Sequence, residues 1–128
     1  MNTIVIIDDE KDICEIMEDI LRGENDLSVH TALNGPDGIS LIRQYRPDVV
    51  ILDVKLQAGM DGVEVLSGIR ESFPEIKVAV ITGYVEDVIE QEIKDIGVDA
   101  YIEKPFTPSE ILQAIRKLLE SKERGHHG

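Results

Sequence analysis

Apolar and polar residues follow one another along the chain in a fivefold pattern, in which each short apolar run is succeeded by an amphipathic segment. The apolar runs cover residues 4–7, 27–32, 49–52, 77–81 and 100–102. The third run, Val49-Val50-Ile51-Leu52, is uninterrupted and mostly β-branched, which is typical of a strand buried on both faces of a parallel sheet. The second run is more polar, as expected of an edge strand.

The segments between these runs carry apolar residues at helical spacing, which predicts five helices. The second and third helices are expected at 36–45 and 62–73, the fourth ends at Gly97, and the fifth runs from about 108 to 121. The side chains expected to face inward are Ile13, Ile16, Met17, Ile20 and Leu21; Ile39, Leu41 and Ile42; Val63, Leu66, Ile69 and Phe73; Val85, Val88, Ile89, Ile93 and Ile96; and Ile111, Leu112, Ile115, Leu118 and Leu119.

Strands that alternate with helices define an α/β fold. Because the crossovers between parallel strands are right-handed, few topologies remain. The leading one is a single doubly wound, five-stranded parallel sheet in the order 2-1-3-4-5. A chain of 128 residues suits one domain, which we place at residues 2–121. Residues 122–128 have no apolar periodicity and are expected to be a disordered tail or an expression remnant.

Composition narrows the possible partners. The chain carries 26 acidic and 13 basic residues, a formal net charge of -13, so direct contact with nucleic acid or with an anionic membrane is disfavoured. Its apolar runs fall short of the roughly 18 residues of a membrane span, and Met1 leads directly into a strand without a basic leader, so we expect a cytoplasmic protein. Cys14 has no cysteine with which to pair, and its place in an amphipathic helix predicts a packing role.

Polar residues follow four of the five predicted strands. They are Asp8-Asp9-Glu10 after the first strand, Asp53 after the third, Thr82-Gly83 after the fourth and Lys104-Pro105 after the fifth. Each has an ordinary explanation alone: Asp53 could open a turn, Thr82 could cap a helix and Lys104 could be a surface lysine. Because ligands bind at the carboxyl ends of the strands in such sheets, however, we expect one common site.

The predicted cluster of carboxylates requires a cation. Two carboxylates about 5 Å apart repel by roughly 3 kcal/mol at an effective dielectric near 20, and oxygen ligands select Mg²⁺, which leaves coordination positions open for phosphate oxygens. Asp53 then has the chemistry of a nucleophile toward phosphorus. Lys104 would offset the charge of the transferring group, and Thr82 would donate a hydrogen bond to a phosphoryl oxygen.

Over about residues 2–120 the chain resembles the receiver domain of the response regulators of two-component signalling. The resemblance lies in Asp8-Asp9, Asp53, Thr82, Tyr101 and Lys104-Pro105-Phe106. It implies a flavodoxin-like fold, a cis bond before Pro105, and Mg²⁺ held by Asp9, Asp53 and the backbone carbonyl of Lys55, with Asp8 acting largely through water. It also implies that a sensor histidine kinase or a histidine phosphotransfer protein supplies the phosphoryl group in a phosphorelay.

The same resemblance implies that Thr82 and Tyr101 form a switch. Phosphorylation would change the surface made by the fourth helix, the fifth strand and the fifth helix, where a downstream target, a fused output domain or a second copy would bind. Enzymatic activity is expected to be at most self-phosphorylation from phosphodonors and autodephosphorylation. The residues expected to set the charge pattern of that surface are Glu86, Glu90, Lys94, Arg116 and Lys117.

The loop after Asp53 departs from the family pattern, since Gln57 stands in the usual proline position and Asp61-Gly62 fall one residue late. Lys55 and Tyr84 flank the expected site. Three alternatives remain open from the sequence. A haloacid-dehalogenase-like Mg²⁺-dependent phosphatase would carry its nucleophile after the first strand and a cap insertion. A flavodoxin-like electron carrier would need a phosphate-binding loop rich in Ser, Thr and Gly there. The third alternative is a receiver-like binding module that is not phosphorylated.

Overall fold

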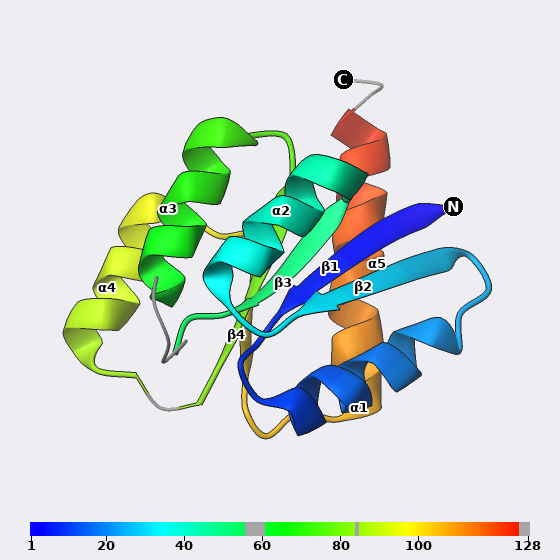
Figure 1. Ribbon diagram of the computed structural model, residues 1–128, viewed down its shortest axis with the longest axis horizontal. Coiled ribbons are helices and arrows are strands. Elements are labelled where there is room, and N and C mark those ends of the chain that lie inside the picture. The colour runs from blue at the N-terminus through cyan, green and yellow to red at the C-terminus, as the bar shows by residue number, and fades with distance from the viewer. Residues whose placement is uncertain (56–60, 84, 126–128) are drawn as a thin grey trace.

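The computed structural model describes residues 1–55, 61–83 and 85–125, and strands alternate with helices along the whole of this part of the chain (Figure 1). The strands are β1 (Asn2–Ile7), β2 (Leu27–Ala32), β3 (Val49–Asp53), β4 (Lys77–Thr82) and β5 (Ala100–Glu103). The helices are α1 (Lys11–Arg22), α2 (Gly35–Tyr45), α3 (Gly62–Ser72), α4 (Asp87–Ile96) and α5 (Pro108–Gly125).

The five strands form one parallel sheet in the order β2-β1-β3-β4-β5, which confirms the predicted fold. β3 lies at the centre, and all five of its residues are buried, as its continuous apolar run predicted. The register aligns Asp53 of β3 with Ile81 of β4, and it aligns Thr82 with Glu103 of β5. The residues that end neighbouring strands therefore meet at one edge of the sheet.

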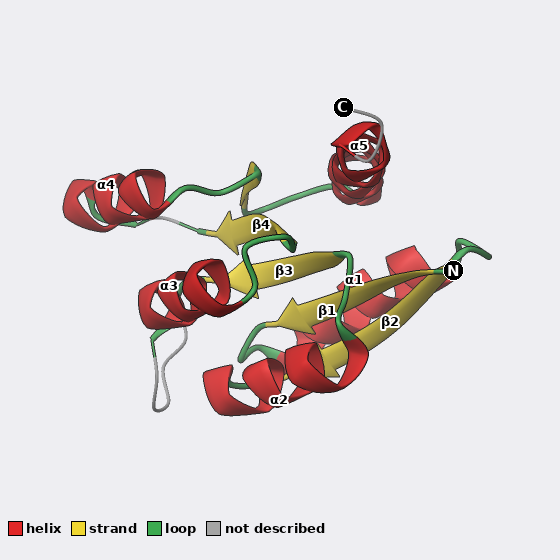
Figure 2. Ribbon diagram, turned by 90° about the horizontal axis from the view of Figure 1, so that it is seen from above, coloured by secondary structure: helices red, strands yellow, loops and turns green. Residues whose placement is uncertain are grey.

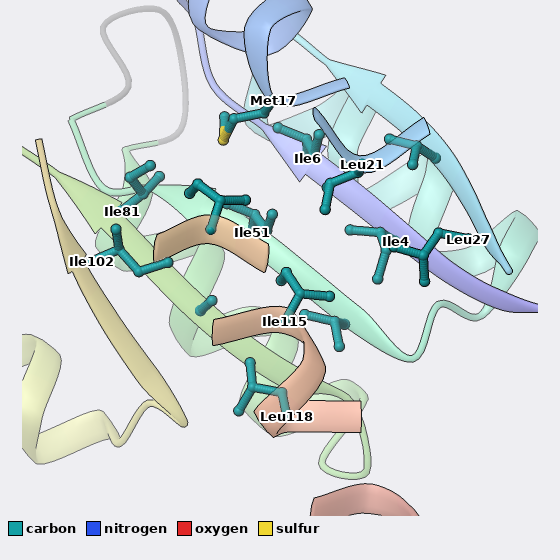
Figure 3. Packing of buried hydrophobic residues seen from close by; sticks show 14 of the residues in the cluster. Ile4, Ile6, Met17, Leu21, Leu27, Ile51, Ile81, Ile102, Ile115 and Leu118 are labelled. Atoms are coloured by element: carbon teal, nitrogen blue, oxygen red, sulfur yellow. The ribbon is translucent and has the colours of Figure 1, made fainter. Parts of the chain in front are cut away.

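Helices cover both faces of the sheet, as the view along it shows (Figure 2). One apolar cluster joins the sheet to α1 and α5, with Met17 and Leu21 from α1 and Ile115 and Leu118 from α5 packing over Ile51 and its neighbours (Figure 3). The other cluster joins the opposite face to α2, α3 and α4. Burial on both faces explains why the central strands show no polar alternation.

Two side chains expected to face inward do not. Ile16 exposes 48% of its surface and Val88 exposes 67%. The buried stripe of α1 is made instead by Cys14, Met17 and Leu21, which leaves Ile16 on its flank. α4 has one buried residue within its bounds, Ile93, because this helix covers the edge of the sheet with a narrow face.

The fifth helix is longer than expected, since it continues to Gly125 and not to about residue 121. Residues 122–124 are Lys, Glu and Arg, which are good helix formers and extend the helix past its last buried apolar residues. Residues 126–128, the remainder of the expected tail, lie outside the described part of the chain. No helix within 1–55, 61–83 or 85–125 is long and apolar enough to cross a membrane.

The start of α3 is packed tightly against the end of β3. A Cβ atom on Gly62 would overlap the backbone of Val54, so only glycine permits this approach. Asp61 caps the helix, because its side chain accepts a hydrogen bond from the backbone N–H of Glu64 at 2.9 Å. These contacts hold α3 close to the strand end that carries Asp53.

Candidate functional site

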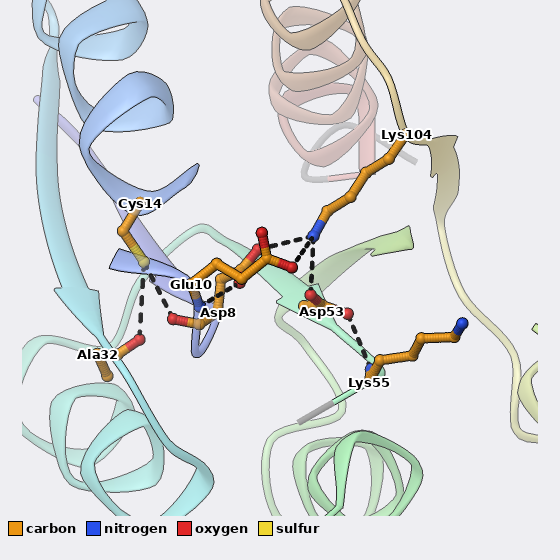
Figure 4. Close-up of polar contacts among 7 residues, drawn as sticks. All are labelled: Asp8, Glu10, Cys14, Ala32, Asp53, Lys55 and Lys104. Atoms are coloured by element: carbon orange, nitrogen blue, oxygen red, sulfur yellow. Dashed lines mark hydrogen bonds and ion pairs between the residues drawn. The ribbon is translucent and has the colours of Figure 1, made fainter. Parts of the chain in front are cut away.

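Asp53 ends the central strand at the carboxyl edge of the sheet and is 2% exposed. Its Oδ2 accepts a hydrogen bond from the Nζ of Lys104 at 2.9 Å, and its Oδ1 accepts one from the backbone N–H of Lys55 at 2.8 Å (Figure 4). The first contact is an ion pair that joins the end of β3 to the residue after β5. The carboxylate is thus fixed on both oxygens, by an ammonium and by a backbone dipole.

Asp8 follows β1 and is fully buried beside Asp53. Its Oδ1 accepts a hydrogen bond from the backbone N–H of Glu10 at 2.9 Å, and its Oδ2 lies 3.4 Å from the Nζ of Lys104. Burial raises the pKa of Asp8 from 3.8 to about 6; the Glu10 N–H opposes this rise, and the Asp53 charge adds to it. Burial and the charge of Asp53 therefore both disfavour a negative charge on Asp8.

Cys14 supports the loop after β1. Its thiol is buried and donates a hydrogen bond to the backbone carbonyl of Asp8, with an Sγ–O distance of 3.2 Å. Burial raises the pKa of Cys14 to about 12, so the thiol is not ionised near neutral pH and is a poor nucleophile. This agrees with the expected packing role.

Four carboxyl groups meet in the pocket. Asp8, Asp9, Glu10 and Asp53 each offer an oxygen, and these four oxygens lie within 4.8 Å of one another. Glu10 was given no role from the sequence, although its position directly after the acidic pair was a usable signal; its Oε1 lies 3.7 Å from the Nζ of Lys104. A set of hard oxygen donors with net negative charge fits a small divalent cation.

Lys104 is the cation around which this cluster is arranged. Burial lowers its pKa, but the hydrogen bond and charge of Asp53, together with the charges of Asp8 and Glu10, outweigh burial and raise the pKa above 10.5. Lys104 therefore stays protonated at neutral pH. Its backbone N–H donates to the carbonyl of Thr82 at 2.8 Å, and its bond to Pro105 is cis, as the resemblance implied.

Thr82 ends β4 and is fully buried. Its hydroxyl oxygen has no hydrogen-bond partner among the residues that the structure describes. A buried hydroxyl without a partner costs about 1–3 kcal/mol, so such an atom is an expected place for a ligand oxygen. A Cβ atom on the next residue, Gly83, would meet no described atom within 4 Å beyond its chain neighbours, and Tyr84, which was expected to flank the site, lies outside the described residues.

Tyr101 on β5 is partly buried, and burial together with the charges of Glu90 and Glu103 raises its pKa above 10. A cavity of about 350 Å³ connects it with Lys104 and Gly83. Tyr101 therefore borders the same cavity as Gly83 and Lys104.

One residue expected on the surface of α4, β5 and α5 lies elsewhere. Arg116 faces the loop between α1 and β2, where its guanidinium lies 2.6 Å from an oxygen of Asp26 and 2.9 Å from one of Glu24. The helical spacing of apolar residues in α5 could not predict the position of Arg116. That spacing indicates which side of the helix faces the sheet, but not which element lies beside each of its other sides.

Both the sequence and the fold of this chain are similar to those of known proteins. The family model for the response regulator receiver domain matches residues 4–116. The chain is 34% identical over 119 residues to sporulation initiation phosphotransferase F of Bacillus subtilis (strain 168), covering 93% of this chain and 94% of that protein.

Two solved structures show the same fold. A CheY-like response regulator receiver domain protein from Methanospirillum hungatei JF-1 superposes with a TM-score of 0.91 at 28% identity and covers 98% of both chains. The receiver domain of NtrX from Brucella abortus gives a TM-score of 0.82 at 30% identity, over 91% of this chain and 98% of that one.

A parallel sheet in this order with an acidic pocket at its carboxyl edge defines a flavodoxin-like signalling domain. The chain belongs to the response-regulator receiver domain family of two-component systems. This assignment excludes the haloacid-dehalogenase and electron-carrier alternatives. The remaining alternative, a receiver-like module that is not phosphorylated, concerns the chemistry of Asp53.

Proposed function

We propose that this receiver domain accepts a phosphoryl group on Asp53. The observation that carries the proposal is the fixed carboxylate of Asp53, held at 2.9 Å by the ammonium of Lys104 in an acidic pocket. In the transfer, a carboxylate oxygen of Asp53 forms a bond to phosphorus while the bond from phosphorus to the donor breaks, and the donor leaves with the electron pair. Lys104 offsets the negative charge of the transferring oxygens.

The donor set supports a role for Mg²⁺. We assign the cation to Asp9, Asp53 and the backbone carbonyl of Lys55, with Asp8 acting through water. When bound, Mg²⁺ would neutralise part of the charge on the carboxylates and on the phosphoryl oxygens. Four carboxyl groups offer oxygens within 4.8 Å of one another, and Lys104 supplies one positive charge among them, so the remaining repulsion favours metal binding.

The hydroxyl of Thr82, which is buried and has no hydrogen-bond partner among the described residues, supports its role as the first element of the switch. A phosphoryl group on Asp53 adds roughly two negative charges and three acceptor oxygens, and the Thr82 hydroxyl gains a partner by donating to one of them. Tyr101 is the second element, because its ring borders the cavity between Gly83 and Lys104. Its movement would change the surface of α4, β5 and α5.

We propose that this surface binds the downstream target, a fused output domain or a second copy of the domain. A depression of about 490 Å³ on it is lined in part by Tyr101, Gln113 and Lys117. A crystal structure with a beryllium fluoride mimic of the phosphoryl group tests the switch. Thr82 and Tyr101 should both change rotamer, and unchanged rotamers away from lattice contacts would refute it.

The phosphoryl donor is expected to be a phosphohistidine on a sensor kinase or a phosphotransfer protein. An apolar depression of about 370 Å³ beside the pocket fits such a partner, since it is lined by Ile13, Ile16, Pro105 and Phe106 next to Lys104. Ile16→Glu should slow transfer from a phosphorylated histidine phosphotransfer domain about tenfold and leave acetyl phosphate reactivity unchanged. Leu33→Glu is the matched control, because Leu33 is 44% exposed on the β2 side.

Intact-mass measurement tests the phosphorylation directly. With acetyl phosphate and Mg²⁺, the parent should gain one phosphoryl group, and EDTA should prevent the gain. Asp53→Asn should show no gain under the same conditions. If the parent gains no mass with either a small acyl phosphate or a phosphohistidine donor, the domain is a binding module that is not phosphorylated.

A further inference from the structure

A groove of about 490 Å³ lies between the amino-terminal ends of α3 and α4, two helices that stand side by side in Figures 1 and 2. It adjoins the site of Asp53 through Lys55, whose backbone N–H donates to Asp53, and its described lining residues include none from β5 or α5. Its floor is apolar and consists of Val54, Val63, Val85 and Ile89. A volume of this size is sufficient for several side chains of a ligand or partner.

The rim of the groove is strongly acidic. Four carboxylates line it: Asp61, Glu64, Glu86 and Glu92. Among the lining residues in the described part of the chain, Lys55 is the one cation. All four are exposed, so their charges act on whatever approaches from solvent. An apolar floor bounded by one sign of charge is the arrangement that selects an amphipathic partner of the opposite sign.

An independent observation concerns α4. Val88 is 67% exposed, the largest exposed fraction among the exposed large hydrophobic residues apart from Met1, and it lies one helical turn before Glu92 of the rim. Single exposed apolar side chains are common. Here Val88 shares a helix face with Glu92 of the rim, four residues further on, so a partner seated in the groove could also cover Val88.

Charge excludes several occupants. Nucleic acid, anionic lipid and phosphorylated peptides are repelled by the rim. A second copy of this chain has a net charge of -13 and would bring like charge to the same place. An amphipathic helix with apolar residues at i, i+3 or i+4 and i+7, and with Lys or Arg on its flanks, fits both floor and rim.

We propose that the groove between α3 and α4 is a docking site for a basic amphipathic helix of a partner protein. The apolar face of that helix packs on Val54, Val63, Val85 and Ile89, and its cationic flanks pair with Glu86 and Glu92 on one side and with Asp61 and Glu64 on the other. The site lies next to Asp53 in the chain but does not require its phosphorylation.

A labelled peptide tests this on the unphosphorylated domain with Mg²⁺ present. The probe is a helical peptide of about 14 residues, roughly four turns, with Leu along one face and Lys on both flanks, followed by fluorescence anisotropy. Glu86→Lys with Glu92→Lys should weaken its binding about tenfold or more, roughly 1.4 kcal/mol. The matched control, Glu71→Lys with Glu120→Lys, changes the net charge equally at exposed positions and should weaken binding less than about threefold.

Two further measurements make the result decisive. A peptide with Ser in place of Leu should not bind, and amide chemical shifts of the parent should change at α3 and α4 when the Leu peptide is added. Equal weakening by both double variants would mean general attraction to an acidic protein and would overturn the proposal. Non-saturable binding, or shifts confined to α5 or to the acidic pocket, would overturn it as well.

Discussion

Replacement of Asp8 by Asn should stabilise the metal-free domain at neutral pH. Asp8 is fully buried beside Asp53, and burial is the largest cause of its raised pKa. In the folded protein the Asp8 carboxyl group loses its proton with a pKa of about 6, whereas in the unfolded chain it does so near 3.8. Asn keeps an oxygen that can accept the hydrogen bond of the Glu10 N–H and removes the buried charge.

The magnitude follows from the pKa. A rise from 3.8 to about 6 is roughly two units, which corresponds to about 3 kcal/mol at 1.36 kcal/mol per unit. Below pH 3.8 Asp8 is protonated in both the folded and the unfolded state, so it does not lower the free energy of unfolding. Between pH 3.8 and 6 only the folded state holds the proton, so the destabilisation by Asp8 grows with pH, and it is complete above about pH 6. The expected advantage of Asp8→Asn is therefore about 1 kcal/mol at pH 4.5 and about 2–3 kcal/mol at pH 7.5.

Urea unfolding in EDTA at these two pH values measures the difference, with Glu120→Gln as an exposed control that should change little. Mg²⁺ at about 100 times its dissociation constant should stabilise the parent by roughly 2.7 kcal/mol and so reduce the advantage of the variant. A variant less stable than the parent at pH 7.5 without metal, or an advantage that does not vary with pH, would refute the reasoning.

Three other predictions concern packing, the switch hydroxyl and a surface ion pair. Gly62→Ala should cost about 3 kcal/mol or more, because its Cβ would overlap the backbone of Val54, the residue after β3. Gly68→Ala in the same helix meets nothing within 4 Å and should stabilise by about 0.5–1 kcal/mol; equal effects in urea unfolding would contradict this. Thr82→Val should stabilise the unphosphorylated domain by about 1 kcal/mol by removing a buried unpartnered hydroxyl, and a loss of stability would show that the hydroxyl has a partner. Arg116→Met should let the pKa of Asp26 rise from about 2 toward 3.8 in an NMR titration, and an unchanged value would mean that the ion pair does not form in solution.

The sheet could be predicted from the sequence because its central strands are buried on both faces. A run such as Val49-Val50-Ile51-Leu52 has few alternatives to a central parallel strand, and once the order was set, Asp8, Asp53, Thr82 and Lys104 had to meet at one edge. The structure brings these four together as expected. The contact between Lys104 and Asp53 spans β4, from the residue after β5 to the end of β3, and a lysine side chain is long enough to make it.

Other features depend on contacts that no local pattern encodes. Ile16 and Val88 fit a helical stripe as well as their buried neighbours do, but the width of the buried face depends on how much of each helix the sheet covers. Arg116 pairs with Glu24 and Asp26 across about 90 positions of sequence. That the Thr82 hydroxyl has no hydrogen-bond partner within 1–55, 61–83 and 85–125 is likewise visible only once the surrounding side chains are placed.

The location of the phosphoryl group is the most direct test of the proposed function. The protein is incubated with acetyl phosphate and Mg²⁺, then reduced with borohydride, which converts an aspartyl phosphate to homoserine, and its peptides are mapped by mass spectrometry. Phosphorylation at Asp53 predicts homoserine at position 53 in the parent and none in Asp53→Asn. Homoserine at position 8 or 9, or a hydroxylamine-sensitive phosphoryl group that persists in Asp53→Asn, would contradict the assignment of Asp53 as the acceptor.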